Sequence, residues 1–83
     1  MTYELRLKPS AEKELKKIDN RYKARIFEAL VGLRQNPDLG KKLEGERKGE
    51  WSYRVWPYRI IYRVYKNELL ILVIRIGHRQ GVY

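Results

Sequence analysis

The chain has 83 residues, which suffices for one small domain, 1–83, with a single core. Its 19 Lys and Arg residues against 10 Asp and Glu residues give a formal charge of +9, which favours a polyanionic partner over a surface that is merely soluble. With no cysteine, one histidine and no apolar stretch long enough to span a bilayer, we expect a cytoplasmic protein without a metal, cofactor or membrane partner.

The first half of the chain predicts a strand followed by a helical hairpin. Residues 2–7 alternate apolar and polar side chains, as in a half-buried strand. Ser10 is a candidate N-cap for the first helix. The apolar stripe of that helix is Ala11, Leu15 and Ile18. A second stripe runs over 22–33, and its helix should end at Asn36 because Pro37 follows.

The second half predicts an antiparallel meander. After a polar segment at 37–50, three β-rich runs follow: Trp51–Trp56, Tyr58–Tyr65 and Leu69–Ile76. The breaks at Pro57 and 66–68 are short, and strands joined by short turns pair antiparallel. We therefore expect an α+β domain of order β-α-α-β-β-β, an antiparallel sheet with the α-helical hairpin packed on one face.

The turn at Pro57 predicts a register in which Val55 pairs with Tyr58. That register places a mainly apolar set on the face that meets the helices: Tyr53, Val55, Tyr58, Ile60, Tyr62 and Val64. The other face, here called the open face, then carries Ser52, Arg54, Arg59, Ile61, Arg63 and Tyr65. Arg54 lies directly opposite Arg59 in this arrangement, and like charges in that position destabilise a sheet.

For the last hairpin we favour a three-residue loop, 66–68, in which Asn67 adopts a positive φ. This loop places the aliphatic side chains of the final strand on the helix face: Leu70, Leu72, Ile74 and Ile76. Arg75 then falls on the open face beside Arg59. A two-residue loop would instead put the aliphatic side chains beside the arginines.

An arginine face suits phosphate, because the guanidinium fork donates two parallel hydrogen bonds and keeps its charge. Nearby aromatic side chains offer stacking surfaces for unpaired bases: Trp51, Trp56, Tyr65 and Tyr83. Lys42, Arg47 and Lys48 would extend the basic track along an RNA backbone, the alternative being a solvated loop. Neither helix is typical of groove recognition, so we favour single-stranded RNA over duplex DNA.

The chain closes on "IGHRQGVY", residues 76–83, which holds groups suited to RNA cleavage. Cleavage through the RNA 2′-hydroxyl needs a base, cations for the phosphate and an acid for the leaving oxygen. His78 or Tyr83 would transfer protons, with arginines as the cations. A structural histidine and a frayed terminal tyrosine are the alternative interpretation.

Three stretches carry a family resemblance: "KKLEG" at Lys41–Gly45, "WSYRVWPYRIIYRV" at Trp51–Val64 and "VIRIGHRQGVY" at Val73–Tyr83. Together they resemble the RelE-type toxins of the RelE/ParE superfamily, from bacterial and archaeal toxin–antitoxin modules. The resemblance covers essentially the whole chain, and it implies the RelE-like β-α-α-β-β-β fold.

The resemblance implies a metal-independent, ribosome-dependent endoribonuclease that enters the A site, next to rRNA, cuts the mRNA there and stops translation. Arg54 matches a basic position on the first meander strand, and Arg59 matches an electrostatic clamp on the scissile phosphate. Arg79 matches the arginine after Gly-x, with the same kind of role, and His78 occupies the x. Tyr83 matches a late tyrosine that stacks on the base or transfers a proton.

Ser52 departs from the pattern, because some members have a lysine there that has been proposed as the base. The resemblance therefore assigns no base in this chain. It also implies a cognate acidic antitoxin, RelB-like, that covers the arginine face and mediates oligomerisation. Two alternatives stay open on the same fold: a ParE-type inhibitor of DNA gyrase, and an RNA-binding relative with weak catalysis.

Overall fold

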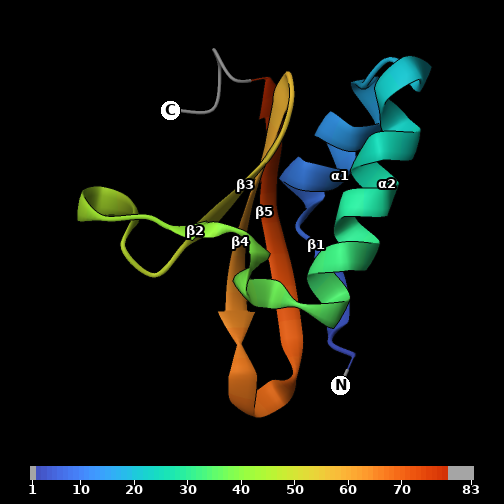
Figure 1. The fold of residues 1–83 in the computed structure, drawn as a ribbon. Helices are drawn as coiled ribbons and strands as arrows, with labels where there is room; N and C mark the ends of the chain where they lie inside the picture. The colour runs from blue at the N-terminus through green and yellow to red at the C-terminus, as the bar shows by residue number, and fades with distance from the viewer. Residues whose placement is uncertain (1, 79–83) are drawn as a thin grey trace.

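The computed structural model describes residues 2–78. The helices and strands, in chain order, are β1 (Glu4–Leu7), α1 (Pro9–Lys17), α2 (Asn20–Gln35), β2 (Lys41–Lys42), β3 (Trp51–Val55), β4 (Tyr58–Tyr65) and β5 (Leu70–His78). Single turns of 3-10 helix lie at Pro37–Leu39, Gly45–Arg47 and Lys66–Glu68. The sheet order is β1-β5-β4-β3-β2, and both helices lie on one side of it (Figure 1).

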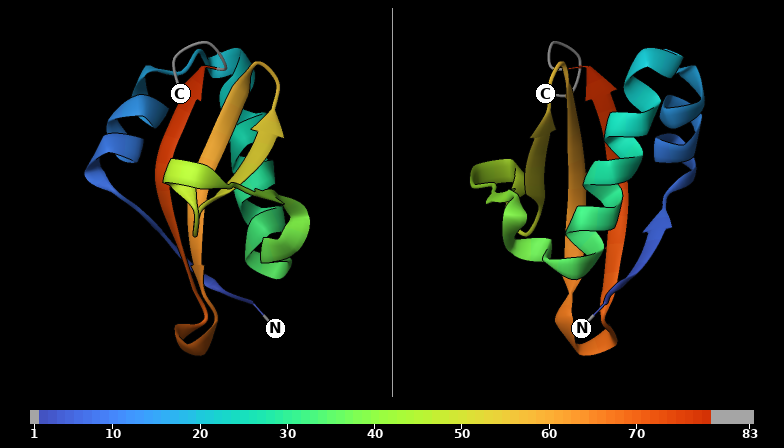
Figure 2. Two further views of the ribbon diagram at one scale, coloured as in Figure 1. Left: turned by 90° about the vertical axis from the view of Figure 1, so that its left-hand side faces the viewer. Right: turned by 45° about the vertical axis from the view of Figure 1, so that its right-hand side comes forward.

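The sheet is mixed, and the predicted α+β class is confirmed. The meander β3–β4–β5 is antiparallel as predicted, β2 adds antiparallel to β3, and β1 joins the far edge parallel to β5. The sequence did not predict β2, because it consists of Lys41 and Lys42 alone and two residues show no period. The segment between β2 and β3 projects on the side of the sheet away from the helices (Figure 2).

The helices begin and end for local reasons. Asp19 caps α2 by accepting a hydrogen bond from the Arg21 N–H at 2.9 Å, and the helix ends at the predicted place, with Asn36 as its C-cap. The predicted N-cap role of Ser10 is wrong. Ser10 lies inside α1, and its hydroxyl donates to the Ile74 carbonyl at 2.9 Å instead.

The core lies between the helical hairpin and one face of the sheet. Its buried members are Ala11, Ile18, Ile26, Leu30, Leu33, Ile60, Tyr62, Ile71, Val73 and Ile76. The predicted helix face of β3 and β4 is confirmed, since Tyr53, Val55, Tyr58 and Val64 pack against this core. Burial of these side chains supplies the main favourable term in folding.

The β3–β4 register is the predicted one, with Val55 opposite Tyr58 and Arg54 opposite Arg59. The predicted last hairpin is wrong in part. The connection includes Leu69, which takes the left-handed conformation (φ 50°) expected at Asn67, so Tyr65 pairs with Leu70. The longer loop shifts the following residues by one, and a one-residue shift moves side chains to the opposite face of a sheet.

Consequently Ile71 and Val73 enter the core, while Leu70 and Leu72 lie opposite Tyr65 and Arg63. An irregularity in the pairing then leaves Ile74 as an extra residue in β5. A bulge of this kind restores the alternation. The predicted positions of Ile76 in the core and Arg75 on the open face are therefore confirmed, and those of Leu70, Leu72 and Ile74 are not. The predicted neighbour of Arg75 is also wrong, because Arg75 lies opposite Ile61 while Arg59 pairs with Gly77.

Helix α1 protects the edge of β5 beyond the end of β1. β1 pairs with residues 70–73, and α1 then runs beside the remainder of the strand. The Glu14 carboxylate accepts a hydrogen bond from the Ile76 N–H at 2.8 Å, so this backbone group is satisfied without another strand. Among residues 2–78, neither α1 nor α2 has the length and apolar character of a membrane-spanning helix.

Candidate functional site

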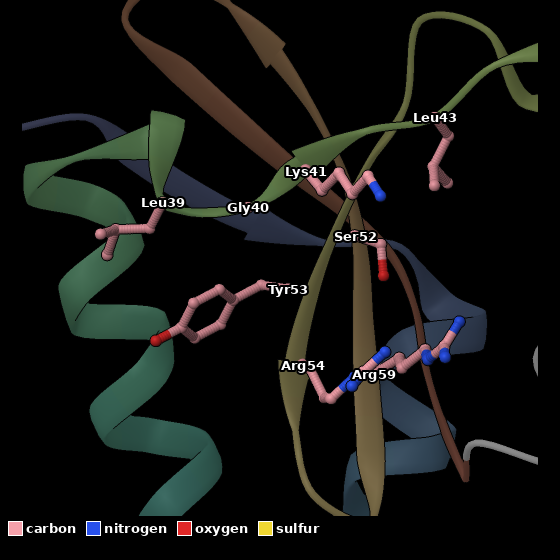
Figure 3. Close-up of a pocket in the computed structure, with 8 residues that line it drawn as sticks. All are labelled: Leu39, Gly40, Lys41, Leu43, Ser52, Tyr53, Arg54 and Arg59. Atoms are coloured by element: carbon pink, nitrogen blue, oxygen red, sulfur yellow. The ribbon is translucent and has the colours of Figure 1, made fainter.

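The open face of β2, β3 and β4 carries a cavity of about 610 Å³. Four of its polar side chains come from three strands and lie on the same side of the sheet (Figure 3). They are Lys41, Ser52, Arg54 and Arg59, a set called here the cation pocket. Tyr53 also lines the cavity, but its side chain points to the helix face and packs against the core. Leu39 and Leu43 contribute to the apolar part of its lining.

Sheet pairing brings the members of the cation pocket together. Arg54 lies directly opposite Arg59 across β3 and β4, and Lys41 lies directly opposite Ser52 across β2 and β3. None of the described residues that line the cavity is acidic, and Arg54 is exposed without an ion pair to any residue within 2–78. Two arginines held face to face repel each other, and an anion between them would relieve that repulsion.

A buried tyrosine holds β2 in place beside the cavity. Tyr62 is fully buried, and its hydroxyl donates to the Pro37 carbonyl at 2.7 Å and accepts from the Gly40 N–H at 3.0 Å. Burial raises the pKa of Tyr62 to about 12. Gly40 has to be glycine here, because a Cβ would collide with the Tyr62 hydroxyl. The backbone immediately before Lys41 is therefore fixed.

The remaining arginines of the open face are paired with glutamates. Glu50 accepts a hydrogen bond from Arg47 at 2.9 Å and lies 3.6 Å from the Arg63 guanidinium. Arg75 forms two hydrogen bonds to Glu14, at 2.7 and 3.2 Å, and this partner raises the pKa of Arg75. The predicted face of four arginines thus divides into a cation pocket and a set of ion pairs.

The other predicted RNA-binding residues lie outside the cation pocket. The Lys42 ammonium lies 5.5 Å from the centre of the Trp51 ring, on the opposite side of β2 from Lys41. Arg47 lies within the loop between β2 and β3 and pairs with Glu50, and Lys48 is exposed next to it. The His78 ring packs edge-on against the Tyr58 ring, with 5.8 Å between their centres.

Arg79 and Tyr83, which the sequence places in the catalytic set, lie outside the described residues. Of that set, the structure brings Arg54 and Arg59 together. It adds Lys41, which sequence reasoning missed. The available signal was the lysine doublet at 41–42, but without a predicted strand nothing indicated which lysine faces the arginines. No group of three or more His, Asp or Glu residues within 2–78 is arranged to hold a metal ion.

Known proteins share both this sequence and this fold. A family model described as the ParE toxin of type II toxin–antitoxin systems matches residues 5–83. The toxin RelG of Mycobacterium tuberculosis is 32% identical over 100% of this chain and 98% of its own length. A chain in the crystal structure of the RelBE2 toxin–antitoxin complex from the same organism superposes with a TM-score of 0.88 at 31% identity, covering 95% of this chain and 100% of that one.

An archaeal structure extends the similarity. In the RelE–RelB complex from Pyrococcus horikoshii, a chain superposes with a TM-score of 0.82 at 25% identity and full coverage of both chains, 100% of each. The matches of sequence and fold agree with the resemblance carried by the three stretches described above. The chain therefore belongs to the RelE/ParE superfamily of toxins from type II toxin–antitoxin systems.

Proposed function

We propose that this toxin is a metal-independent endoribonuclease that cuts mRNA in the ribosomal A site and thereby stops translation. The observation that carries the proposal is the cation pocket, in which Arg54 and Arg59 face each other beside a lysine and a hydroxyl. Guanidinium groups bind phosphate oxygens through paired hydrogen bonds, and they stay charged at every physiological pH. A single-stranded RNA backbone is the polyanion that fits this open, shallow surface.

Cleavage of the RNA strand needs a base and an acid in addition to these cations. The RNA 2′-oxygen attacks the adjacent phosphorus and the bond to the 5′-oxygen breaks, which leaves a 2′,3′-cyclic phosphate and a 5′-hydroxyl. A base takes the 2′-hydroxyl proton, and an acid gives one to the leaving 5′-oxygen. Arg54 and Arg59 would stabilise the negative charge that grows on the phosphate oxygens. In this proposal Arg79 adds to them, and His78 or Tyr83 transfers protons; these three roles remain predictions.

We propose in addition that an acidic, RelB-like antitoxin binds this toxin in the cytoplasm and mediates its oligomerisation. Two similar toxins were solved as toxin–antitoxin complexes, which supports a partner of this kind. The formal charge of +9 supports an acidic one, because it would steer a negatively charged segment toward the cation pocket. Such a segment, folding as it binds, is able to cover a large area.

The test is cutting of a defined mRNA in a purified translation system, mapped by primer extension. Wild-type toxin should produce cuts at codons in the A site, and Arg59→Ala should lower the cutting rate about 100-fold, the typical effect of removing one group that stabilises the transition-state charge. Arg6→Ala, on β1 at the far edge of the sheet, is the control for nonspecific loss of charge. Intact mRNA with folded wild-type toxin would refute the proposal.

Inhibition of DNA gyrase is the second candidate function. The matching family model is described as a ParE toxin, which favours this branch of the superfamily. A supercoiling assay with purified gyrase separates the two candidates. Inhibition of supercoiling together with intact mRNA would replace the nuclease proposal by the gyrase one.

A further inference from the structure

Lys41 occupies a place in the cation pocket that its sequence position does not suggest. It lies directly opposite Ser52 on the neighbouring strand, so the two side chains share the open face. The cavity that it lines also takes in Arg54 and Arg59 (Figure 3). We propose that Lys41 is a substrate-binding residue. It binds the phosphate of the RNA strand next to the phosphate held by Arg54 and Arg59. This inference rests on the proposed nuclease function.

The charge of Lys41 is available to a ligand. Its side chain is exposed and has no ion pair or hydrogen bond with another residue in the described part of the chain. Arg63 and Arg75, by contrast, are engaged by Glu50 and Glu14. A lysine ammonium is a compact point charge on a flexible stem, which suits a phosphate whose position along a bound strand varies slightly.

The neighbouring Lys42 faces away from the cation pocket. Adjacent residues in a strand point to opposite faces, and Lys42 accordingly extends over the ring of Trp51 on the other side of β2. The backbone of β2 is held on both sides of the doublet. The Tyr62 hydroxyl binds Gly40 before it, and the Leu43 N–H donates to the Glu50 carbonyl at 2.9 Å after it. Lys41 is therefore the lysine that the fold presents to the pocket.

The spacing along β3 indicates a second phosphate rather than the same one. Ser52, opposite Lys41, and Arg54 are two residues apart on this strand, which corresponds to about 6.6 Å of rise. Cations separated in this way suit successive phosphates of one strand better than the oxygens of a single phosphate.

The experiment measures binding of a fluorescent, single-stranded RNA oligonucleotide by anisotropy over a range of salt concentrations. Lys41→Ala should weaken binding about fivefold at 0.1 M salt and reduce the slope of log affinity against log salt by about 0.7, the contribution of one phosphate contact on a single strand. Lys66→Ala, an exposed lysine of the last hairpin, is the matched control and should keep the slope. The double variant Lys41→Ala with Ser52→Lys should restore it, since the two positions face each other.

Equal losses for Lys41→Ala and Lys66→Ala would overturn the inference, and so would a loss for Lys42→Ala that matched or exceeded the loss for Lys41→Ala. Cutting of mRNA by the same variants separates this inference from the proposed function. If wild-type toxin cuts and Lys41→Ala cuts equally well, the inference fails and the nuclease stands. If wild-type toxin does not cut but Lys41→Ala alone reduces the salt slope, the nuclease proposal fails and the phosphate contact of Lys41 stands.

Discussion

Two groups of arginines share the open face, and their surroundings differ. Arg54 and Arg59 face each other in a cavity whose described lining residues include no acid. Arg63 and Arg75 lie further along the same sheet and pair with Glu50 and Glu14. The number of arginines on a face therefore does not indicate how many of them are available to a ligand. The placement of the glutamates shows that Arg63 and Arg75 are engaged within the fold, whereas Arg54 has no ion pair to any residue within 2–78.

Alanine substitution in each of the two groups should affect mRNA cutting very differently. Arg54→Ala should lower the rate of mRNA cutting about 100-fold, because it removes charge at the reacting phosphate. Arg63→Ala should change that rate less than about threefold, because its charge is already offset by Glu50. Primer extension under single-turnover conditions measures both. Similar losses in the two variants would mean that the face acts as one undivided cation patch.

A second prediction concerns the glutamates. Glu14→Ala should lower the free energy of unfolding by about 2 kcal/mol, because it leaves the part-buried Ile76 N–H and the Arg75 guanidinium without their acceptor. Glu12→Ala, an exposed carboxylate on the same helix, should change it by less than about 0.5 kcal/mol. Urea unfolding followed by tryptophan fluorescence provides the values. An equally small change in both variants would show that the pair of Glu14 and Arg75 does not stabilise the fold.

The third prediction concerns Tyr62, which holds the backbone next to β2, and the dependence of the free energy of unfolding on pH. Burial raises the pKa of Tyr62 in the folded state to about 12, whereas the tyrosine of the unfolded chain has its ordinary pKa of about 10. The stability linked to its protonated form is therefore complete below pH ~10 and is lost as the pH rises toward ~12, with a slope of at most about 1.4 kcal/mol per pH unit. Tyr62→Phe should lack this loss, and exposed Tyr65→Phe should retain it. Parallel curves for wild type and Tyr62→Phe would contradict the burial of an intact hydroxyl.

The effect of alanine substitution on the free energy of unfolding should be small and opposite in sign for the two groups. Arg54→Ala should raise the free energy of unfolding by about 0.5 kcal/mol, because it removes the repulsion from Arg59 directly opposite. Arg63→Ala should lower it by a similar amount, since it breaks the contact with Glu50. Thermal unfolding at low and high salt checks both, and added salt should shrink each difference. Destabilisation by Arg54→Ala would show that this arginine helps to hold the sheet.

The fold could be predicted from the sequence where the local pattern of apolar and polar residues is strong. The β3–β4 hairpin was predicted residue by residue, because its alternation and its short turn allow one register. The last strand was not, since a continuous aliphatic run has no alternation, and the left-handed residue is Leu69 rather than Asn67. The partner of Arg75 could not be predicted either, because Glu14 contacts it only through the packing of α1 against β5.

The candidate site shows the same limit. Arg54 and Arg59 were predicted to lie together because both belong to one hairpin, and the structure confirms their pairing. Lys41 was missed because its strand has two residues and the preceding Gly40 is held by a tyrosine 22 positions further along the chain. Long-range contacts of this kind leave no periodic signal in the sequence. The roles of Arg79 and Tyr83 stay predictions that rest on the family resemblance.

The lysine doublet of β2 keeps a positive charge beside the cation pocket even when the pairing of β2 with β3 shifts by one residue. A slip of one residue in the pairing of β2 with β3 would turn Lys41 away from the cavity, but it would turn Lys42 toward it. Either alignment therefore presents one positive charge at the same place. A change in that pairing would therefore alter the shape of the cation pocket more than its charge.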